Sequence, residues 1–286
     1  MKKAAIALAV GALATTLAAC GSNPTSNASG GFGSCDVTGK AGSIALTTQK
    51  PGVLTVATVL PNPGWWNGTN PSDVDSGFEY CMAADIAHQA GLTSVVVKNL
   101  AWDQYISGTA TGFDVGIAST TITPDRKKVF DFSAPYFSSN LGVATKAGSN
   151  LTAADLKDAK IGVLQGNLGA QWVADVLKPT QHPATFQAQA DMFTALAAGQ
   201  VDAVVTDTTL ALTSIKASNG ILEVKGQFDL NQGYGVVLPR GSANSDQVSK
   251  AIDTMSADGT LDALGATYLQ PLFGANPNDI PMWTLP

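Results

Sequence analysis

The sequence predicts an α/β fold with mainly parallel sheets. Segments typical of strands alternate with segments typical of helices along the chain, as they do in proteins built from βαβ units. The chain is also long enough, at 286 residues, to form one large or two modest domains with a substantial core. In open sheets of this kind, ligands bind beyond the carboxyl ends of the strands.

The first half of the chain supplies the clearest elements. A helix is expected over 79–90, because Met82, Ile86 and Ala90 recur at four-residue spacing and Gly91 follows to end it. A second helix is expected over 102–110. The strands expected around these helices are 53–59 (VLTVATV), 94–98 and 114–119.

The second half repeats the alternation. Thr152 and Asp155 have the spacing of a capping box before Leu156 and indicate a short helix. A further helix is expected over 191–198, with Gly199 after it, and a late one over 246–255. The strands expected between them are 161–164, 202–206 and 235–238.

The N-terminus has the layout of a signal peptide. Two lysines precede an apolar run over 4–14, which is shorter than the roughly 20 residues of a membrane span. The following segment Leu17-Ala18-Ala19-Cys20 resembles the lipobox of bacterial lipoproteins. That resemblance implies that residues 1–19 are removed and that Cys20 carries the lipid, and the alternative is an ordinary secreted protein with a cysteine near its cleavage site.

The composition restricts the partners of the chain. The net charge is −6 and only 13% of residues are charged, against roughly 25% in an average domain. An acidic chain without basic clusters argues against binding to nucleic acid or to anionic lipid. Membrane contact is therefore expected through the lipid anchor alone, with residues 20–49 as a tether and arm that begins rich in Ser, Gly and Asn.

Two cysteines remain beyond Cys20. Cys35 and Cys81 could form a disulfide in an oxidising compartment, or could be two free thiols. The chain contains no Cys-x-x-Cys, and His88 and His182 are its only histidines. Neither a metal site nor a cofactor is expected.

Several motifs in order resemble a known family. The strand 114–119 is followed by Thr-Thr-Ile-Thr-Pro-Asp-Arg (120–126) and by Phe-Ser-Ala-Pro-Tyr (132–136). This order resembles the extracellular solute-binding proteins of polar amino acid ABC importers. The resemblance extends over nearly the whole chain beyond the N-terminal segment, through Gly-Phe-Glu at 77–79, Ile-Gly-Val-Leu-Gln-Gly at 161–166, the segment 197–207, Tyr-Gly-Val-Val at 234–237 and Asp-Gly-Thr at 258–260.

The resemblance implies a two-lobe, periplasmic-binding-protein-like (type II) fold with a hinge and a ligand cleft. The first lobe is expected to comprise 50–140 and 236–286, and the second lobe 141–235. The crossings are expected near 140–144 and 233–236, and the tail 271–286 is expected as a strap over the first lobe. The implied partners are a free amino acid and an ABC importer permease, and the chain is expected to be a monomer.

The resemblance also implies which residues hold the ligand. Arg126 lies where the family has its carboxylate clamp, and Asp207 where it has the carboxylate that accepts from the ammonium. Both ligand charges need partners once the cleft excludes water, and a guanidinium can grip a carboxylate through two parallel hydrogen bonds. Ser119 and Thr121 precede the arginine at matching positions. An alternative role for Asp207 is to cap a helix.

The second-lobe loop departs from the family. Where the family has a threonine or serine two residues after the glycine of Gln165-Gly166, this chain has Leu168. A hydroxyl contact is lost, although the backbone N–H of Asn167 or Leu168 could donate if it opens a helix. Asn167 could replace that hydroxyl, or the ligand could be a non-standard amino acid. Gln165 and Asn62 are further candidate polar contacts.

The ligand side chain is expected to meet aromatic residues. Trp65, Trp66 and Trp102 occupy regions that resemble those whose aromatics stack on the ligand in the family, although at least one of the first two could pack in its own lobe. Val59 stands where the family tends to place an acid for cationic ligands. A neutral or acidic amino acid is therefore expected.

Two other classes of function share this fold. Some members act as extracytoplasmic dehydratases of cyclic amino or keto acids through a carboxylic acid in the cleft. The chain has only two glutamates, Glu79 and Glu223, and no motif of nucleophilic or metal-dependent catalysis, so no enzyme activity is expected. A ligand-sensing subunit of a membrane receptor would use the same cleft.

Overall fold

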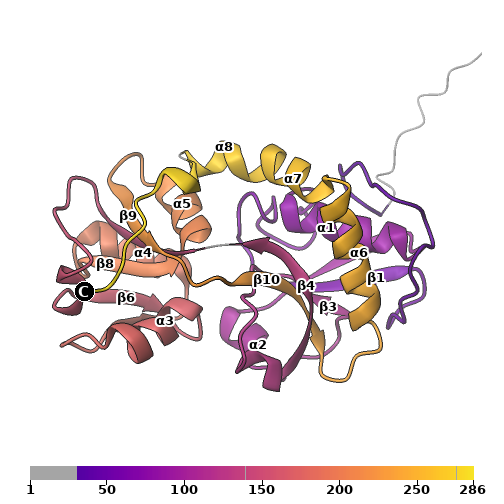
Figure 1. The fold of residues 1–286 in the computed structure, drawn as a ribbon. Helices are drawn as coiled ribbons and strands as arrows, with labels where there is room; N and C mark the ends of the chain where they lie inside the picture. The colour runs from indigo at the N-terminus through magenta and orange to yellow at the C-terminus, as the bar shows by residue number, and fades with distance from the viewer. Residues whose placement is uncertain (1–30, 139, 275) are drawn as a thin grey trace, which may run out of the picture.

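The chain folds into two α/β lobes, one around each of two five-stranded sheets (Figure 1). The computed structural model describes residues 31–138, 140–274 and 276–286. The strand order is β2-β1-β3-β10-β4 in the first sheet and β7-β6-β8-β5-β9 in the second. The expected two-lobe α/β fold is therefore confirmed, whereas the signal peptide and Cys20 lie outside the described residues.

The first lobe is built on the strands β1 (Val53–Thr58), β2 (Ser94–Asn99), β3 (Val115–Gly116), β4 (Phe130–Ser138) and β10 (Gly233–Pro239). Its central helix α1 (Phe78–Gln89) is buried along nearly its whole length. Gly77 immediately precedes α1 with φ 116°, and a Cβ there would lie 2.5 Å from the carbonyl oxygen of Trp65, so only glycine fits. Helix α2 (Trp102–Ile106) ends earlier than expected, because Gly108 follows with φ 74°.

The second lobe is built on the strands β5 (Leu141–Lys146), β6 (Ile161–Leu164), β7 (Ala184–Phe186), β8 (Ala203–Asp207) and β9 (Leu222–Phe228). The helices α3 (Leu168–Trp172), α4 (Gln189–Ala198) and α5 (Thr208–Lys216) cover it, and α3 continues through a π-helical turn (Val173–Leu177). Val204 and Val205 of β8 belong to two different apolar clusters. Successive side chains point to opposite faces of a strand, so this central strand is buried on both faces.

Both sheets are mixed, which corrects the expectation of mainly parallel sheets. Strand β10 runs antiparallel to β3 and β4, and β5 runs antiparallel to β8 and β9. A parallel neighbour requires a crossover connection, usually a helix. The chain instead crosses between the lobes through short connections, from β4 to β5 and from β9 to β10. The strand that enters the first lobe, β10, pairs antiparallel with β4, and the strand that enters the second lobe, β5, pairs antiparallel with β9.

The two crossings lie slightly earlier than the sequence predicts. Leu141 already pairs with Asp207 and Phe228 in the second sheet, and Gly233 already pairs with Ser138 in the first. The connections between the sheets are therefore 139–140 and 229–232. Only two short connections of this kind join the sheets within the described residues, an arrangement suited to a hinge.

The C-terminal region makes a third connection between the lobes. Helix α6 (Ser245–Ala257) leads into α7 (Thr260–Leu264), a π-helical turn (Gly265–Leu269) and α8 (Gln270–Phe273). Figure 1 shows α7 over the first lobe and the yellow chain continuing through α8 to the second lobe. Leu269 and Phe273 belong to an apolar cluster that includes the first-lobe core and also Leu210 and Leu212 of α5 in the second lobe.

The final residues pack on the second lobe, not over the first lobe as expected. The N–H of Gln227 on β9 donates to the carbonyl of Pro281 at 2.9 Å, and the N–H of Trp283 donates to the carbonyl of Gln227 at 2.7 Å. The Trp283 ring lies against Phe228, and the absence of a side chain at Gly226 makes room for it. The tail thus pairs with β9, which differs from the assignment of 236–286 to the first lobe.

A disulfide fixes the N-terminal arm to the first lobe. Cys35 and Cys81 of α1 are bonded, with their Cα atoms 5.3 Å apart. Their pairing, rather than the alternative of two free thiols, is the arrangement in the structure. Thr38 adds to the attachment, because its hydroxyl donates to the Asp85 carboxylate at 2.9 Å.

Replacing both cysteines by serine is expected to lower the free energy of unfolding by about 4 kcal/mol. The bridge closes a loop across a sequence separation of 46 residues, and the loss of chain entropy in the unfolded state for a loop of that size corresponds to about 4 kcal/mol. Urea unfolding of the variant and of the oxidised wild type measures the difference. Equal midpoints would contradict this role of the bridge.

Within the ranges that the structure describes, no helix has both the length and the apolar character needed to cross a membrane.

Candidate ligand-binding site

A cavity of about 420 Å³ lies between the two lobes. The first lobe contributes the ends of β1 and β2 with Trp102 and Ser119, and the second lobe contributes Leu164, Asn167 and the start of α4. The side chains that line it are uncharged, and the polar ones are Asn62, Asn99, Ser119, Asn167, Gln187 and Gln189 together with the indole of Trp102. The cavity therefore lies where the ends of strands from both lobes meet.

Arg126 joins the two lobes. Its Nη1 donates to the carbonyl of Thr121 in the first lobe at 2.8 Å, and its Nη2 donates to the carbonyl of Gly166 in the second lobe at 2.9 Å. The guanidinium carbon lies 5.7 Å from the centre of the Trp102 ring, within the range of a cation–π contact. Burial lowers the pKa of Arg126, whereas the negative charge of Asp207 raises it.

Asp207 ends β8 and lies in the electrostatic field of Arg126. Its residue is 2% exposed, and its Oδ2 accepts a hydrogen bond from Asn167 Nδ2 at 3.2 Å. Burial raises the pKa of Asp207, while the bond from Asn167 and the charge of Arg126 lower it. It is also the residue before α5, but its side chain makes no capping hydrogen bond there. The alternative role as a helix cap is therefore not what the structure shows.

Asn167 lines the cavity and connects helix α3 to Asp207. Its Oδ1 accepts from the N–H of Gly169 at 2.7 Å and caps α3, while its amide donates to Asp207. Leu168 is the first residue of α3 and is buried. Since the N–H of Asn167 donates to the carbonyl of Leu164, the Leu168 N–H remains as the candidate backbone donor from this loop.

Trp102 and Gln165 meet across the cleft. The indole Nε1 of Trp102 donates to the carbonyl of Gln165 at 2.8 Å. The adjacent Gly166 has φ 71°, and a Cβ there would lie 3.5 Å from that indole nitrogen. The side chain of Gln165 is exposed and does not line the cavity, so this residue contributes its backbone rather than the expected polar side chain.

Ser119 and Thr121 act differently from expectation. The Ser119 hydroxyl donates to Glu79 Oε1 at 3.1 Å, which directs it toward the first-lobe interior, although the residue still lines the cavity. Thr121 is buried, and its carbonyl accepts from Arg126. The contact that this segment makes with the arginine is therefore the Thr121 carbonyl and not a hydroxyl.

Trp65 and Trp66 do not form part of the cleft, which corrects the expected aromatic pocket. Both are 0% exposed and belong to the first-lobe core. Trp65 packs edge-on against Phe78 and Phe137, with ring centres 5.4 and 5.0 Å away. The core shields both rings because large aromatic surfaces are stabilised by burial. Of the three tryptophans expected at the site, only Trp102 lines the cavity.

Sequence reasoning did not identify the amides Asn99, Gln187 and Gln189 as lining residues. Asn99 ends β2, and Gln187 and Gln189 follow β7. The signal that could have found them is the same one that indicated Asp207, since each stands at or just after the carboxyl end of a strand.

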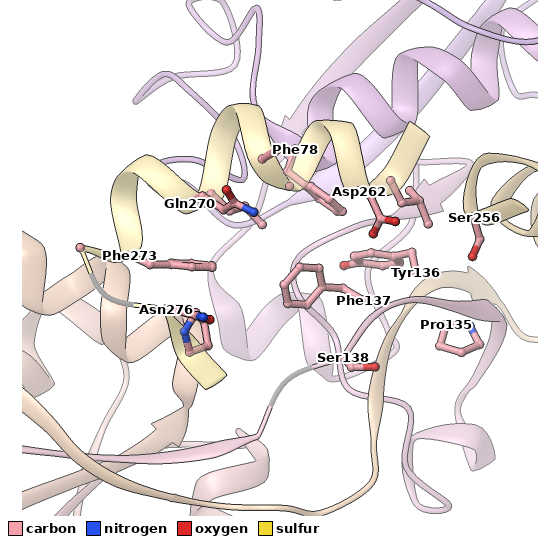
Figure 2. A pocket seen from close by; sticks show the side chains of 16 residues that line it. Phe78, Pro135, Tyr136, Phe137, Ser138, Ser256, Asp262, Gln270, Phe273 and Asn276 are labelled. Atoms are coloured by element: carbon pink, nitrogen blue, oxygen red, sulfur yellow. The ribbon is translucent and has the colours of Figure 1, made fainter. Parts of the chain in front are cut away.

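A second, larger cavity of about 1010 Å³ lies between the C-terminal helices and the end of β4. Figure 2 shows Phe78, Tyr136, Phe137 and Phe273 around it. None of the ligand-binding residues expected from the sequence lines this cavity. We assign the ligand to the smaller cavity, because Arg126 and Asp207 lie beside its lining residues Trp102 and Asn167.

Comparison with known proteins identifies the family. Residues 54–271 match the bacterial extracellular solute-binding proteins, family 3. The chain belongs to this family. It is 32% identical over 206 residues to the L-cystine-binding protein TcyJ of Escherichia coli (strain K12), an alignment that covers 70% of this chain and 75% of that protein. It is 28% identical to the L-cystine-binding protein TcyA of Bacillus subtilis (strain 168), covering 94% of this chain and 97% of that protein.

Solved structures show the same fold. An ancestral arginine-binding protein bound to arginine matches with a TM-score of 0.67 at 31% identity, covering 76% of this chain and 98% of that one. The ancestral amino acid-binding protein AncCDT-1, a precursor of cyclohexadienyl dehydratase, matches with a TM-score of 0.67 at 27% identity, covering 77% and 96%. TcyJ and TcyA are both named as L-cystine-binding proteins.

Proposed function

We propose that this protein captures a free, neutral and polar α-amino acid by closing its two lobes, and delivers it to an ABC importer. The observation that carries this proposal is the placement of Arg126 and Asp207 beside a cavity with an uncharged lining. One charged group comes from each lobe. Only closure brings both to the same ligand.

The charges of the two residues match the two charges of an amino acid. A closed cleft removes water from the ligand's carboxylate and ammonium, and each charge must then be paired. Arg126 uses two of its donors on backbone carbonyls, and a guanidinium has others that can bind a carboxylate. Asp207 is a buried acceptor suited to the ammonium.

The cavity lining argues for an uncharged side chain on the ligand. A cationic side chain would need an acid at the far end of the cavity, and an acidic one would need a base, whereas the lining there offers the amides of Asn62, Asn99, Gln187 and Gln189. Amides donate and accept hydrogen bonds without a net charge. Relatives of this chain bind L-cystine, glutamine or arginine, and the lining favours the first two ligands.

The mode of attachment is part of the proposal. The lipobox-like segment before Cys20 supports a signal peptide over 1–19 and a lipid on the Cys20 thiol, which would hold the protein at the extracytoplasmic face of the membrane as a monomer beside its permease. The acidic composition supports attachment through the lipid rather than through charge.

The experiment is a calorimetric titration of the protein, without residues 1–20, against the twenty standard L-amino acids and L-cystine. We expect one or a few neutral polar ligands to bind, and we expect arginine, lysine and glutamate to bind at least about tenfold more weakly, because a charge left unpaired in the cavity costs more than about 1.4 kcal/mol. Preferential binding of a charged amino acid would contradict the proposed specificity. Binding of none would contradict amino acid capture.

A further inference from the structure

Glu79 lies at the centre of a buried network beneath the ligand site. It is 0% exposed. Its Oε2 accepts from the indole Nε1 of Trp66 at 2.6 Å, and its Oε1 accepts from the Tyr136 hydroxyl at 2.6 Å. Oε1 also accepts both the N–H of Ser119, at 2.7 Å, and the Ser119 hydroxyl, at 3.1 Å. Two of these four bonds come from Ser119, which lines the ligand cavity.

All four partners act as donors. An indole N–H and a backbone N–H can only donate, and both hydroxyls are at donor distance from oxygen. An ionised carboxylate accepts from all of them, whereas a protonated one would lose an acceptor site. Burial raises the pKa of Glu79, and the hydrogen bonds from Tyr136, Ser119 and Trp66 lower it.

Ser119 has a backbone conformation that needs support. Its φ is 48°, in the left-handed region, where a residue other than glycine is strained. The residues that follow are fixed in turn: the Thr120 hydroxyl lies 2.9 Å from the Tyr105 hydroxyl, and the Thr121 carbonyl accepts from Arg126. The conformation at Ser119 therefore determines how the chain reaches the ligand clamp.

We propose that Glu79 is a positioning residue for ligand binding, which holds Ser119 in its left-handed conformation and thereby orients residues 118–121 and Arg126 toward the ligand. The inference rests on the proposed function. Glu79 also connects this segment to the hinge, since Tyr136 lies on β4 two residues before Ser138, where the first sheet ends.

The first test compares E79Q with E223Q. Glutamine keeps the shape of the side chain, but its neutral oxygen accepts the bonds from Ser119 and Tyr136 more weakly than a carboxylate does, and its amide N–H₂ opposes the N–H of Trp66. Glu223, the other glutamate, lies in the second lobe beside Lys225 with a side chain 37% exposed, and it serves as the matched control. We expect E79Q to lower the affinity for L-glutamine and L-cystine at least about tenfold, measured well below the melting temperature, and E223Q to leave it unchanged.

The second test separates positioning from general stability. Glycine adopts a positive φ without steric cost, so S119G should reduce the dependence on Glu79. In the protein that keeps Ser119, we expect E79Q to lower the affinity at least about tenfold. In the S119G background we expect E79Q to lower it less than about threefold, while its effect on the melting temperature is similar in both backgrounds.

Four results would overturn the inference or its basis. If E79Q lowers the melting temperature but not the affinity, or costs the same affinity in both backgrounds, Glu79 is only a structural residue. If E79Q does not fold, S119A and S119G decide the question: S119G should retain more affinity than S119A, and the reverse order would contradict positioning. If the wild type binds neither L-glutamine, L-cystine nor another amino acid, the proposed function fails and this inference fails with it.

Discussion

Arg126→Ala is expected to reduce the affinity for the amino acid by at least about 30-fold, since truncating one partner of a buried, hydrogen-bonded charge pair costs about 2–5 kcal/mol. The substitution leaves the ligand carboxylate without its cation inside a closed cleft. It also removes the bond to the Gly166 carbonyl that connects the lobes. Calorimetric titration with the ligand identified for the wild type measures the loss.

Two further variants test whether the loss of affinity is specific to the Arg126 guanidinium. Arg126→Lys keeps the charge but cannot form paired, parallel hydrogen bonds, so it should recover only part of the affinity. Lys127→Ala alters the neighbouring residue, which is exposed, and should bind as the wild type does. Full affinity in Arg126→Ala, with the melting temperature preserved, would contradict the role of Arg126 as the carboxylate clamp.

Asp207→Asn is expected to lower the affinity by at least about 30-fold, because the ammonium of the ligand loses its only charged partner and an unpaired buried charge costs at least about 2 kcal/mol. The substitution keeps the size of the side chain and an oxygen that can accept from Asn167. Asp202→Asn is the matched control, since Asp202 lies just before the same strand but is exposed.

The pH dependence of binding provides a second readout for Asp207. Burial raises the pKa of this carboxyl, and only its ionised form attracts the ammonium. The affinity should therefore be fully present above the raised pKa and be lost as the pH falls through it, at a higher pH than for an exposed aspartate. The loss should be absent from Asp207→Asn. An identical pH profile in both proteins would contradict this role.

Much of the fold could be predicted from local patterns. The helix α1 and the strands β1, β2, β6 and β8 lie within one or two residues of their expected bounds, because apolar spacing and flanking glycines specify such elements directly. The resemblance to the family implied that Arg126 and Asp207 belong to different lobes, and the structure places them so.

The remaining features depend on contacts between distant segments. The antiparallel pairing of β10 in the first sheet and of β5 in the second follows from how the chain crosses between the lobes. The packing of Trp283 depends on the missing side chain of Gly226 on a distant strand. Trp65 and Trp66 look alike in sequence whether they line a cleft or a core. Glu79 acquires its importance only when four donors from three separate segments converge on it.

The most direct test is a crystal structure of the protein with the amino acid that the titrations select. The proposal requires the ligand in the 420 Å³ cavity between the lobes, with its carboxylate within hydrogen-bonding distance of the Arg126 guanidinium and its ammonium within that distance of Asp207. A ligand bound in the larger cavity beside α8, or one in the cleft that contacts neither residue, would contradict it.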